Sequence, residues 1–450
     1  MHAVDLGELE RAYFGHVSGL IERYAPILAA AEVDAVVIHS GSALKRTEFD
    51  DQYWPLRPTP HFQHWLPLSQ PDCALVVEPG TKPKLAWLTS KSFWERPPEP
   101  DARYFETVFD VHTFADVADI KTLIPTGRVA FIGDARPQAR SWGIVEERIN
   151  PQTLVGPLDR LRSLKTSYEV LCLAEANRKA AVGHAAALDA FRTGGASELE
   201  IHLRFLAATG QDDPETPYKN IVAEGPHAAT LHHVSYSKRP SDHAAQSLLV
   251  DAGATYLGYC SDITRTWVKG SGAVASAFGQ LVDGLEKMQQ RLCSAIKVGF
   301  RYEELHEDSH RQVAALLREV GIAKGSLEEI TKSGLSRSFY PHGLGHSLGL
   351  QCHDVGCALV KPKDDNPYLR NTSVITEGQV FTIEPGIYFI EPLLEQLRVS
   401  EHSSMVDWEL VGELAIMGGV RIEDDLVVTG GEFVTRNITR EVLPVGGGVA

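Results

Sequence analysis

The chain has 450 residues, of which 43% are hydrophobic and 23% charged, as in an ordinary folded protein and unlike a disordered, collagenous or coiled-coil one. Its 59 acidic residues outnumber 43 basic ones, and the formal charge of −16 argues against non-specific binding to nucleic acid or to an anionic membrane. The most apolar early stretch, residues 25–38, is interrupted by Glu32 and Asp34, so no membrane-spanning segment is expected.

The six cysteines form no Cys-x-x-Cys pair, and the first residues are polar where a signal peptide needs an apolar run. We therefore expect a cytoplasmic protein with reduced thiols.

Helix and strand patterns alternate in the first third of the chain. A helical period runs over residues 9–31. Short apolar strands are expected at 35–38, 74–77, 85–88 and 129–132. This alternation predicts a small α/β domain over residues 1–162. Residues 54–68 and 94–100, which are rich in proline and aromatic side chains, are expected to be loops.

The remainder, residues 163–450, mixes helices and strands without regular alternation and is predicted to be an α+β domain. Capping-box patterns at Thr166 and Ser197 begin two helices. Further helices are expected over 276–298 and 302–320, and strands over 246–251 and 379–383. The last residues, 446–450, are expected to be a frayed tail.

Five acidic or imidazole side chains each lie in an apolar or glycine-rich segment: Asp251, Asp262, His346, Glu384 and Glu423. A hairpin that uses Gly253 and Gly258 would bring the first two carboxylates to one face of a sheet. Either Asp alone is more typical of a turn or a strand edge, so the prediction depends on the whole set. Four carboxylates and one imidazole, without a thiolate, suit two hard or borderline divalent ions rather than a structural zinc site.

Five segments in this order resemble motifs of the pita-bread metallopeptidases: Asp251-Ala-Gly, Asp262-Ile-Thr-Arg-Thr, His342-Gly-Leu-Gly-His346, Thr382-Ile-Glu384-Pro-Gly-Ile-Tyr388 and Gly419-Val-Arg-Ile-Glu423-Asp. Within that family the sequence is most similar to the bacterial prolidases, which are Xaa-Pro dipeptidases. Residues 39–41 and 49–53 also resemble the variants described as organophosphorus acid anhydrolases. The resemblance implies a creatinase-like α/β N-terminal domain, an α+β pita-bread catalytic domain and a homodimer.

The resemblance also implies two divalent metal ions, Mn²⁺ first, with Co²⁺ or Zn²⁺ as alternatives. Their implied ligands are Asp251, Asp262, His346, Glu384 and Glu423. Asp262 and Glu423 would bridge the metals, and Glu384 would also act as general base toward a hydroxide held between them.

The remaining roles are implied for residues at family positions. By resemblance, His232, His342 and His353 bind the scissile carbonyl or protonate the leaving proline nitrogen. The alternative for His342 is that it supports a metal ligand. By resemblance, Arg370 binds the C-terminal carboxylate of the substrate. Arg421 is a second candidate for this contact, or else a partner of the ligand carboxylates.

Tyr218 and Asp51 are implied in the substrate pocket, with Asp51, or Asp50 in its place, reaching the site of the neighbouring subunit. Some positions depart from the family pattern: His233 stands where relatives often carry an aromatic residue, and Cys352 and Cys357 flank His353.

These roles imply a metal-dependent dipeptidase that hydrolyses Xaa-Pro dipeptides, with phosphotriester hydrolysis as a side activity. The nearest alternative, an Xaa-Pro aminopeptidase, shares all five ligands but accepts longer peptides. A catalytically inactive pita-bread protein that serves as an interaction module is a further alternative, against which the intact ligand set argues. A small peptide substrate is expected, and neither nucleic acid nor a membrane is expected as a partner.

Overall fold

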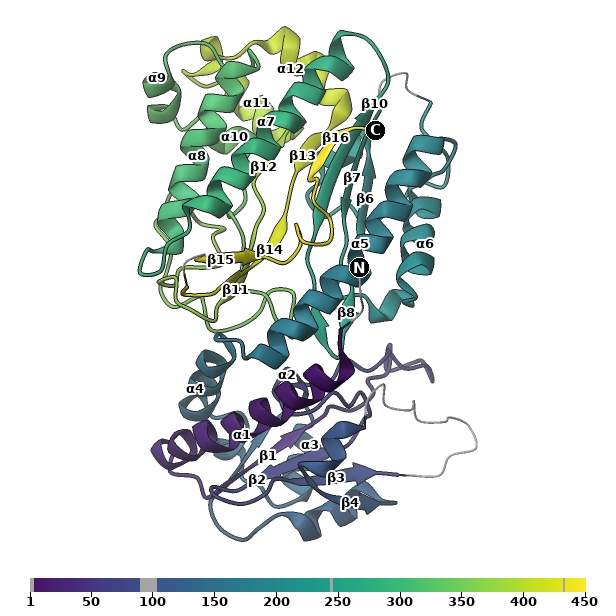
Figure 1. Cartoon of the computed structure of the whole chain (residues 1–450), viewed down its shortest axis with the longest axis vertical. Helices are drawn as coiled ribbons and strands as arrows, with labels where there is room; N and C mark the ends of the chain where they lie inside the picture. The colour runs from purple at the N-terminus through teal and green to yellow at the C-terminus, as the bar shows by residue number, and fades with distance from the viewer. Residues whose placement is uncertain (1–3, 90–102, 243–245, 432–433) are drawn as a thin grey trace. The chain divides into compact units, whose positions relative to one another are not determined.

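The computed structural model describes residues 4–89, 103–242, 246–431 and 434–450. The chain divides into two compact units, residues 2–171 and 172–450, which we call the N-terminal unit and the C-terminal unit (Figure 1). The loop expected at 94–100 lies outside the described residues. Within the described ranges, every helix is too short or too polar to cross a bilayer.

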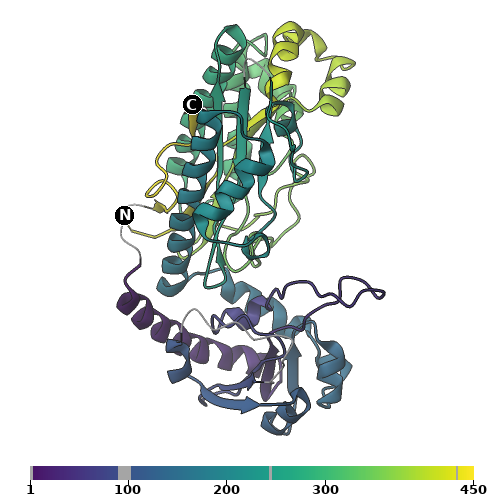
Figure 2. The ribbon, with the colours of Figure 1, turned by 90° about the vertical axis from the view of Figure 1, so that its right-hand side faces the viewer.

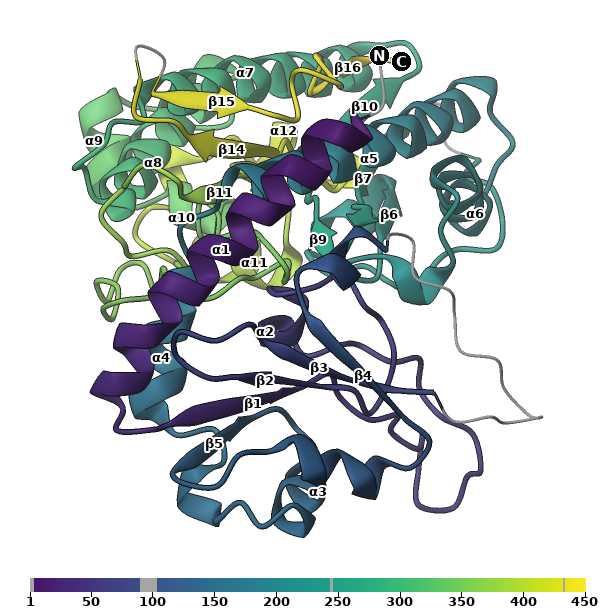
Figure 3. The same ribbon diagram turned by 60° about the horizontal axis from the view of Figure 1, so that its bottom comes forward.

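A five-stranded sheet with the order β4-β3-β2-β1-β5 forms the centre of the N-terminal unit (Figure 3). Its strands are β1 (Ala35–His39), β2 (Ala74–Val77), β3 (Lys84–Leu88), β4 (Asp110–Phe114) and β5 (Val129–Ile132). Strand β1 runs parallel to β5 and antiparallel to β2, and every residue of these three strands is buried. Continuous apolar runs are typical of such buried strands, so the predicted α/β class is confirmed.

The helices of this unit are α1 (Leu6–Ala30), α2 (Pro60–Gln63), α3 (Arg136–Ser141) and α4 (Gln152–Arg162). Helix α1 begins after Asp5, whose carboxylate accepts hydrogen bonds from the backbone N–H groups of Gly7 and Glu8. The expectation of a loop throughout residues 54–68 is wrong at α2, which has Pro60 at its first position. Strand β4 was not expected because it is partly exposed and lacks an apolar run.

The C-terminal unit contains a sheet with the order β16-β10-β7-β6. These strands are β6 (Ile221–Glu224), β7 (Gln246–Asp251), β10 (Thr264–Lys269) and β16 (Gly447–Val449), with the hairpin β8 (Thr255–Tyr256) and β9 (Tyr259–Cys260) between β7 and β10. The expectation of a frayed tail is wrong, because β16 pairs in parallel with β10 (Figure 1). Figure 2 marks the C-terminus on this unit. A Cβ on Gly447 would lie 2.2 Å from the carbonyl oxygen of Thr266, so glycine permits this close pairing.

A second group of strands carries the later motifs. It comprises the sheet β11 (Val380–Ile383), β14 (Asp424–Val428) and β15 (Thr435–Asn437), and the pair β12 (Gly386–Tyr388) and β13 (Gly419–Arg421). The helices of the unit are α5 (Ser167–Thr193), α6 (Glu198–Thr209), α7 (Ala273–Ala295), α8 (Tyr302–Glu319), α9 (Leu327–Lys332), α10 (Ser336–Phe339), α11 (Glu391–Arg398) and α12 (Trp408–Leu414). Thr166 and Glu169 form the predicted capping hydrogen bonds at the start of α5.

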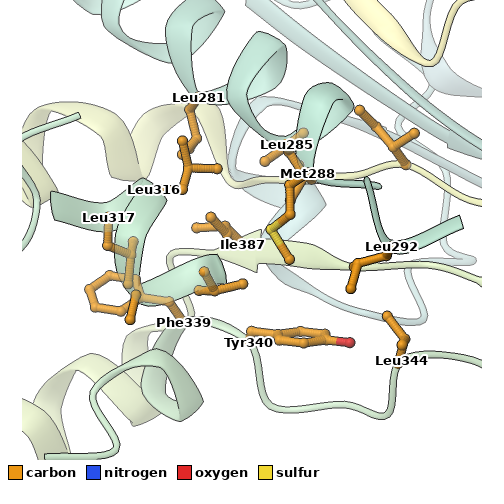
Figure 4. Packing of buried hydrophobic residues seen from close by; sticks show 14 of the residues in the cluster. Leu281, Leu285, Met288, Leu292, Leu316, Leu317, Phe339, Tyr340, Leu344 and Ile387 are labelled. Carbon is orange, nitrogen blue, oxygen red and sulfur yellow. The ribbon is translucent and has the colours of Figure 1, made fainter. Parts of the chain in front are cut away.

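The largest apolar core lies between α7, α8 and these strands. Leu281, Leu285 and Met288 project from α7 toward Leu317 of α8 and Ile387 of β12 (Figure 4). All five side chains are buried, and full burial of one such side chain contributes about 1.5–3 kcal/mol. The core therefore fixes the strands that flank Glu384 and Glu423.

Candidate metal centre

The first two predicted ligands meet at one end of the hairpin between β7 and β10. Asp251 ends β7 and pairs with Thr264, two residues after Asp262. Both carboxylates are buried, and the hydroxyl of Tyr218 lies 2.7 Å from Asp251 Oδ1 and 2.5 Å from Asp262 Oδ1. A phenol has one proton to donate, so it satisfies one carboxylate at a time. Tyr218, which was expected to line the substrate pocket, thus contacts two predicted ligands.

The imidazole of His346 belongs to the same cluster. Its Nε2 lies 3.2 Å from Asp262 Oδ2, 3.7 Å from Glu384 Oε1 and 3.9 Å from Glu423 Oε1. Its Nδ1 donates to the carbonyl oxygen of Ser347 at 3.0 Å, which fixes the ring orientation. Nε2 is therefore the nitrogen that faces the carboxylates.

The two glutamates enter the cluster from the other group of strands. Glu384 directly follows β11, and Glu423 lies between β13 and β14, where it forms an isolated bridge with Thr264. Thr264 Oγ1 donates to Glu423 Oε2 at 2.7 Å. Ligand atoms of Asp262, His346 and Glu423 all lie within 4.8 Å of one another. The five side chains thus converge from four separate stretches of sequence: the hairpin that carries Asp251 and Asp262, and the segments that carry His346, Glu384 and Glu423.

Arg421 is a buried partner of the acids. Its Nη2 donates to Asp251 Oδ2 at 2.6 Å, its Nη1 to Tyr388 Oη at 2.9 Å and its Nε to Thr264 Oγ1 at 3.2 Å. The guanidinium is therefore already engaged within the protein. This arrangement favours the alternative in which Arg421 orients Asp251 over the one in which it binds substrate.

Negative charge is in excess in this cluster, because four carboxylates face one guanidinium and one imidazole. Burial raises the pKa of Glu384 to about 7, and it also raises the pKa of Glu423 well above its usual range, with Asp262 adding to both shifts. Burial acts against the charged form of His346, yet Asp262 raises its pKa to about 9. Divalent cations would balance the excess charge, and a donor set of carboxylate oxygens with one imidazole fits them.

His342 is held on both ring nitrogens. Its Nδ1 donates to the carbonyl oxygen of Gly343 at 2.8 Å, so its Nε2 accepts from the hydroxyl of Tyr388, also at 2.8 Å. Burial and the charge of Arg421 lower the pKa of His342 to about 3, which keeps the ring neutral. Because Tyr388 also contacts Arg421, His342 is linked through it to the acids. This link favours the alternative in which His342 supports a metal ligand and does not contact the substrate.

Three other predicted residues have unused polar atoms. His353 is exposed, and its ring meets the edge of His346 with the centroids 4.4 Å apart. His232 and Arg370 are also exposed, and neither forms a hydrogen bond or ion pair with any residue that the structure describes. Partial desolvation lowers the pKa of His353, and the charges of His346, Arg370 and His232 add to the shift. His232 and Arg370 are thus close enough to His353 for their charges to act on it.

Asp51 belongs to the N-terminal unit and is exposed. Its Oδ1 accepts a hydrogen bond from Gln52 Nε2 at 3.1 Å, while Asp50 Oδ1 accepts from the backbone N–H of Gln52 at 2.9 Å. Lys45 and Tyr53 form a bridge that closes this loop. The assignment of Asp51 or Asp50 to a substrate pocket stays a prediction.

Sequence reasoning gave no role to three residues in contact with the cluster: Thr264, Tyr388 and Cys352. Thr264 and Tyr388 lie inside the family motifs given above, and their hydroxyl groups could have indicated hydrogen bonds to the ligands. Cys352 Sγ lies 2.9 Å from Asp262 Oδ2. Burial and the neighbouring carboxylate raise the pKa of this thiol, so it is a hydrogen-bond donor to the ligand.

Family comparisons cover most of the chain. The model of metallopeptidase family M24 matches residues 172–430, and the model of the Xaa-Pro dipeptidase N-terminal domain matches residues 11–159. A protein named Xaa-Pro dipeptidase from Photorhabdus laumondii is 40% identical, with 97% of this chain and 99% of the relative covered. One of the same name from Pseudoalteromonas atlantica is 37% identical over the same shares.

Solved structures share the fold at low sequence identity. Zinc-substituted aminopeptidase P of E. coli in complex with product has a TM-score of 0.73 at 21% identity, with 98% of this chain and 96% of that chain covered. Proline aminopeptidase P II from Yersinia pestis has a TM-score of 0.72 at 21% identity, with 96% of each chain covered. These likenesses, with the family matches, confirm the predicted creatinase-like domain followed by a pita-bread domain.

Proposed function

Because the chain belongs to metallopeptidase family M24, we propose that it is a metal-dependent Xaa-Pro dipeptidase. The observation that carries the proposal is the convergence of Asp262, His346, Glu384 and Glu423 on one buried, negatively charged cluster. The near-complete coverage of relatives named Xaa-Pro dipeptidase supports the substrate class.

We assign two divalent ions to Asp251, Asp262, His346, Glu384 and Glu423. When bound, such ions supply Lewis-acid chemistry that acidifies water and polarises the peptide carbonyl. The oxygen-rich donor set favours Mn²⁺, with Co²⁺ and Zn²⁺ as alternatives. Tyr218, Thr264 and Arg421 orient the ligand carboxylates through the hydrogen bonds described above.

The chain's own residues handle the proton and the substrate. Glu384 accepts the proton of the attacking water on a carboxylate oxygen. His353, which packs against His346, and the exposed His232 donate to the carbonyl oxygen or to the departing proline nitrogen. Arg370, with its unused donors, binds the substrate's terminal carboxylate in a bidentate fashion. Because Arg370 would bind that carboxylate one residue beyond the scissile bond, the substrate is limited to a dipeptide.

The assembly and location are also part of the proposal. We infer a homodimer from the family resemblance, with the loop around Asp51 as the candidate contribution to the neighbouring site. A reducing, cytoplasmic location is supported by the six cysteines, none of which is paired in the structure described. Phosphotriester hydrolysis is proposed only as a side activity of the same centre.

A paired assay tests the function. An Xaa-Pro dipeptide and the same peptide extended by one residue are compared after chelation and after reloading with Mn²⁺, with bound metal measured in parallel. We expect chelation to abolish cleavage and Mn²⁺ to restore it for the dipeptide. Efficient cleavage of the longer peptide would instead support the aminopeptidase alternative, and full activity without metal would refute the mechanism.

A further inference from the structure

The loop that carries His232 is tied to one buried carboxylate. Glu198 is the first residue of α6, and its side chain is 0% exposed. It accepts four hydrogen bonds: on Oε1 from the backbone N–H of Glu224 at 2.8 Å and His227 Nδ1 at 2.7 Å, and on Oε2 from His233 Nε2 at 3.0 Å and the backbone N–H of Ser237 at 2.6 Å. All four donors belong to residues 224–237.

These four contacts saturate the carboxylate, whose two oxygens offer about four acceptor positions. Burial opposes ionisation of Glu198, but His233 and the backbone N–H groups of Glu224 and Ser237 hold its pKa at about 2. An ionised carboxylate has no proton to give. His227 Nδ1 and His233 Nε2 must therefore both be donors, which fixes how each ring is turned.

The contacts bracket His232. Two of them precede it in the sequence, from Glu224 and His227, and two follow it, from His233 and Ser237. The side chain of His232 forms no hydrogen bond with the described part of the chain, so its position depends on this backbone. Glu198 thus closes the loop on both sides of the residue.

Backbone packing at Gly225 helps to fix the first half of the loop. A Cβ on Gly225 would lie 3.0 Å from the carbonyl oxygen of Ile416, and one on Gly418 would lie 2.1 Å from the carbonyl oxygen of Gly225. In the second half, Val234 and Ser235 are exposed. That half is anchored by Tyr236, whose hydroxyl donates to the carbonyl oxygen of Asn220 and whose ring packs against His202. On either side of Tyr236, the side chain of His233 and the backbone N–H of Ser237 bond to Glu198.

A metal ion is the competing interpretation of this cluster, because ligand atoms of Glu198, His227 and His233 lie within 4.8 Å of one another. The two imidazoles are stacked, with centroids 4.5 Å apart and planes inclined by 21°. Nearly parallel, stacked rings cannot both direct an in-plane lone pair at one ion. Both facing nitrogens also carry protons, so the geometry favours a hydrogen-bonded clamp.

His232 is close enough to His342 and His353 for its charge to act on both. Burial is the main cause of the lowered pKa values of His342 and His353, and the charge of His232 contributes to both. We propose that Glu198 is a positioning residue that holds His232 against the substrate by clamping residues 224–237. The proposal rests on the proposed dipeptidase function, in which His232 contacts the reacting groups.

Glu198→Gln in the Mn²⁺-loaded protein tests the clamp. Glutamine keeps the shape but places an NH₂ group against two donors, so the loop loosens. We expect kcat for an Xaa-Pro dipeptide to fall about 10- to 100-fold, as for a small displacement of a reacting group, with KM changed less than about threefold. The matched control is Glu200→Gln on the same helix turn, which keeps an acceptor for the capping hydrogen bonds and should leave kcat unchanged.

A double-mutant cycle separates positioning from general damage. In a His232→Ala background, Glu198→Gln should lower kcat by less than about threefold, because the residue it positions is gone. Losses that multiply fully would overturn the proposal. So would an unchanged kcat in the single variant.

Hydrogen exchange supplies a readout that does not depend on catalysis. Amides of residues 230–237 should exchange faster in Glu198→Gln, with bound metal unchanged, and unchanged exchange would refute the clamp. If that variant does not fold, His227→Ala removes one half-exposed donor and should show the same faster exchange and a smaller fall in kcat. If the wild-type protein fails to cleave Xaa-Pro dipeptides, the proposed function is wrong, while the exchange result still decides whether Glu198 holds the loop.

Discussion

Glu423 and Asp424 are neighbours in sequence and are both buried, yet their carboxylates have opposite surroundings. Asp424 accepts hydrogen bonds from four side chains: Arg265 Nη2 at 2.9 Å, Arg440 Nε at 2.5 Å, Gln289 Nε2 at 2.8 Å and Asn437 Nδ2 at 2.9 Å. Glu423 accepts one from Thr264 and otherwise faces three other carboxylates, with His346 Nε2 3.9 Å away and the charge of Arg421 nearby. Burial disfavours charge at both, but the two arginines hold the pKa of Asp424 below its usual range.

The difference separates a carboxylate that the protein neutralises from one that we propose as a metal ligand. Adjacent residues in extended chain point to opposite faces. Asp424 therefore faces its arginine and amide partners on one side, while Glu423 faces the carboxylate cluster on the other. The protein itself neutralises Asp424, whereas the charge of Glu423 and its neighbours needs cations from outside. Each prediction below breaks or sharpens this contrast.

The largest effect is expected for Glu423→Gln. This change removes a carboxylate from the cluster, so bound metal should be lost together with activity. We expect kcat/KM for an Xaa-Pro dipeptide to fall about 10⁴-fold or more, a large part of the acceleration of about 10⁶-fold or more typical of enzymes. Metal analysis and steady-state kinetics measure both losses. A variant that keeps its metal and activity would contradict the assignment of Glu423.

Asp424→Asn should instead destabilise the fold. It leaves the fully buried guanidinium of Arg265 without its carboxylate partner, and breaking a buried ion pair in this way costs about 3–5 kcal/mol. Urea denaturation of metal-free protein gives the difference in free energy of unfolding. A stability equal to that of the wild type would contradict a stabilising role for the buried ion pair between Asp424 and Arg265.

A similar contrast holds between arginines, because the guanidinium of Arg370 has unused donors whereas that of Arg265 is bonded within the protein. Arg370→Met should raise KM about 10- to 100-fold, since a hydrogen bond to a charged group contributes about 1.5–3 kcal/mol, with little change in kcat. Arg370→Lys should recover part of the loss. A fall in kcat at constant KM would contradict binding of the substrate carboxylate by Arg370.

The smallest effect concerns the pH dependence of stability without metal. The pKa of Glu384 is about 7 in the folded protein against about 4.5 for the free side chain, so folding favours its protonated form. Its cost to stability is absent below pH 4.5, grows as pH rises and is complete above pH 7. Glu384→Gln should therefore stabilise chelator-treated protein by about 1–3 kcal/mol at pH 7.5 and by little at pH 4.5. An effect equal at both pH values would contradict the raised pKa.

Local patterns predicted much of the fold and the centres of the motifs. Buried strands such as β1 and β7 are continuous apolar runs, and the capping boxes at Thr166 and Ser197 are signals within four residues. Strand β16 could not be predicted in this way, because its glycines carry no hydrophobic pattern and its pairing depends on a distant strand. The sequence also did not indicate that the hydroxyl of Tyr218 contacts both Asp251 and Asp262, because these residues are distant from it along the chain.

By itself the sequence singled out the residues proposed to carry the chemistry, because carboxylates and imidazoles inside apolar segments need charged or polar partners. Only the tertiary structure decided how their charges are balanced. Arg421 supports Asp251, Glu198 clamps the loop of His232, and Arg370 keeps its donors unused. These partners are remote in sequence, and hydrogen-bond geometry and burial, which decide whether a charge is neutralised, exist only once the chain has folded.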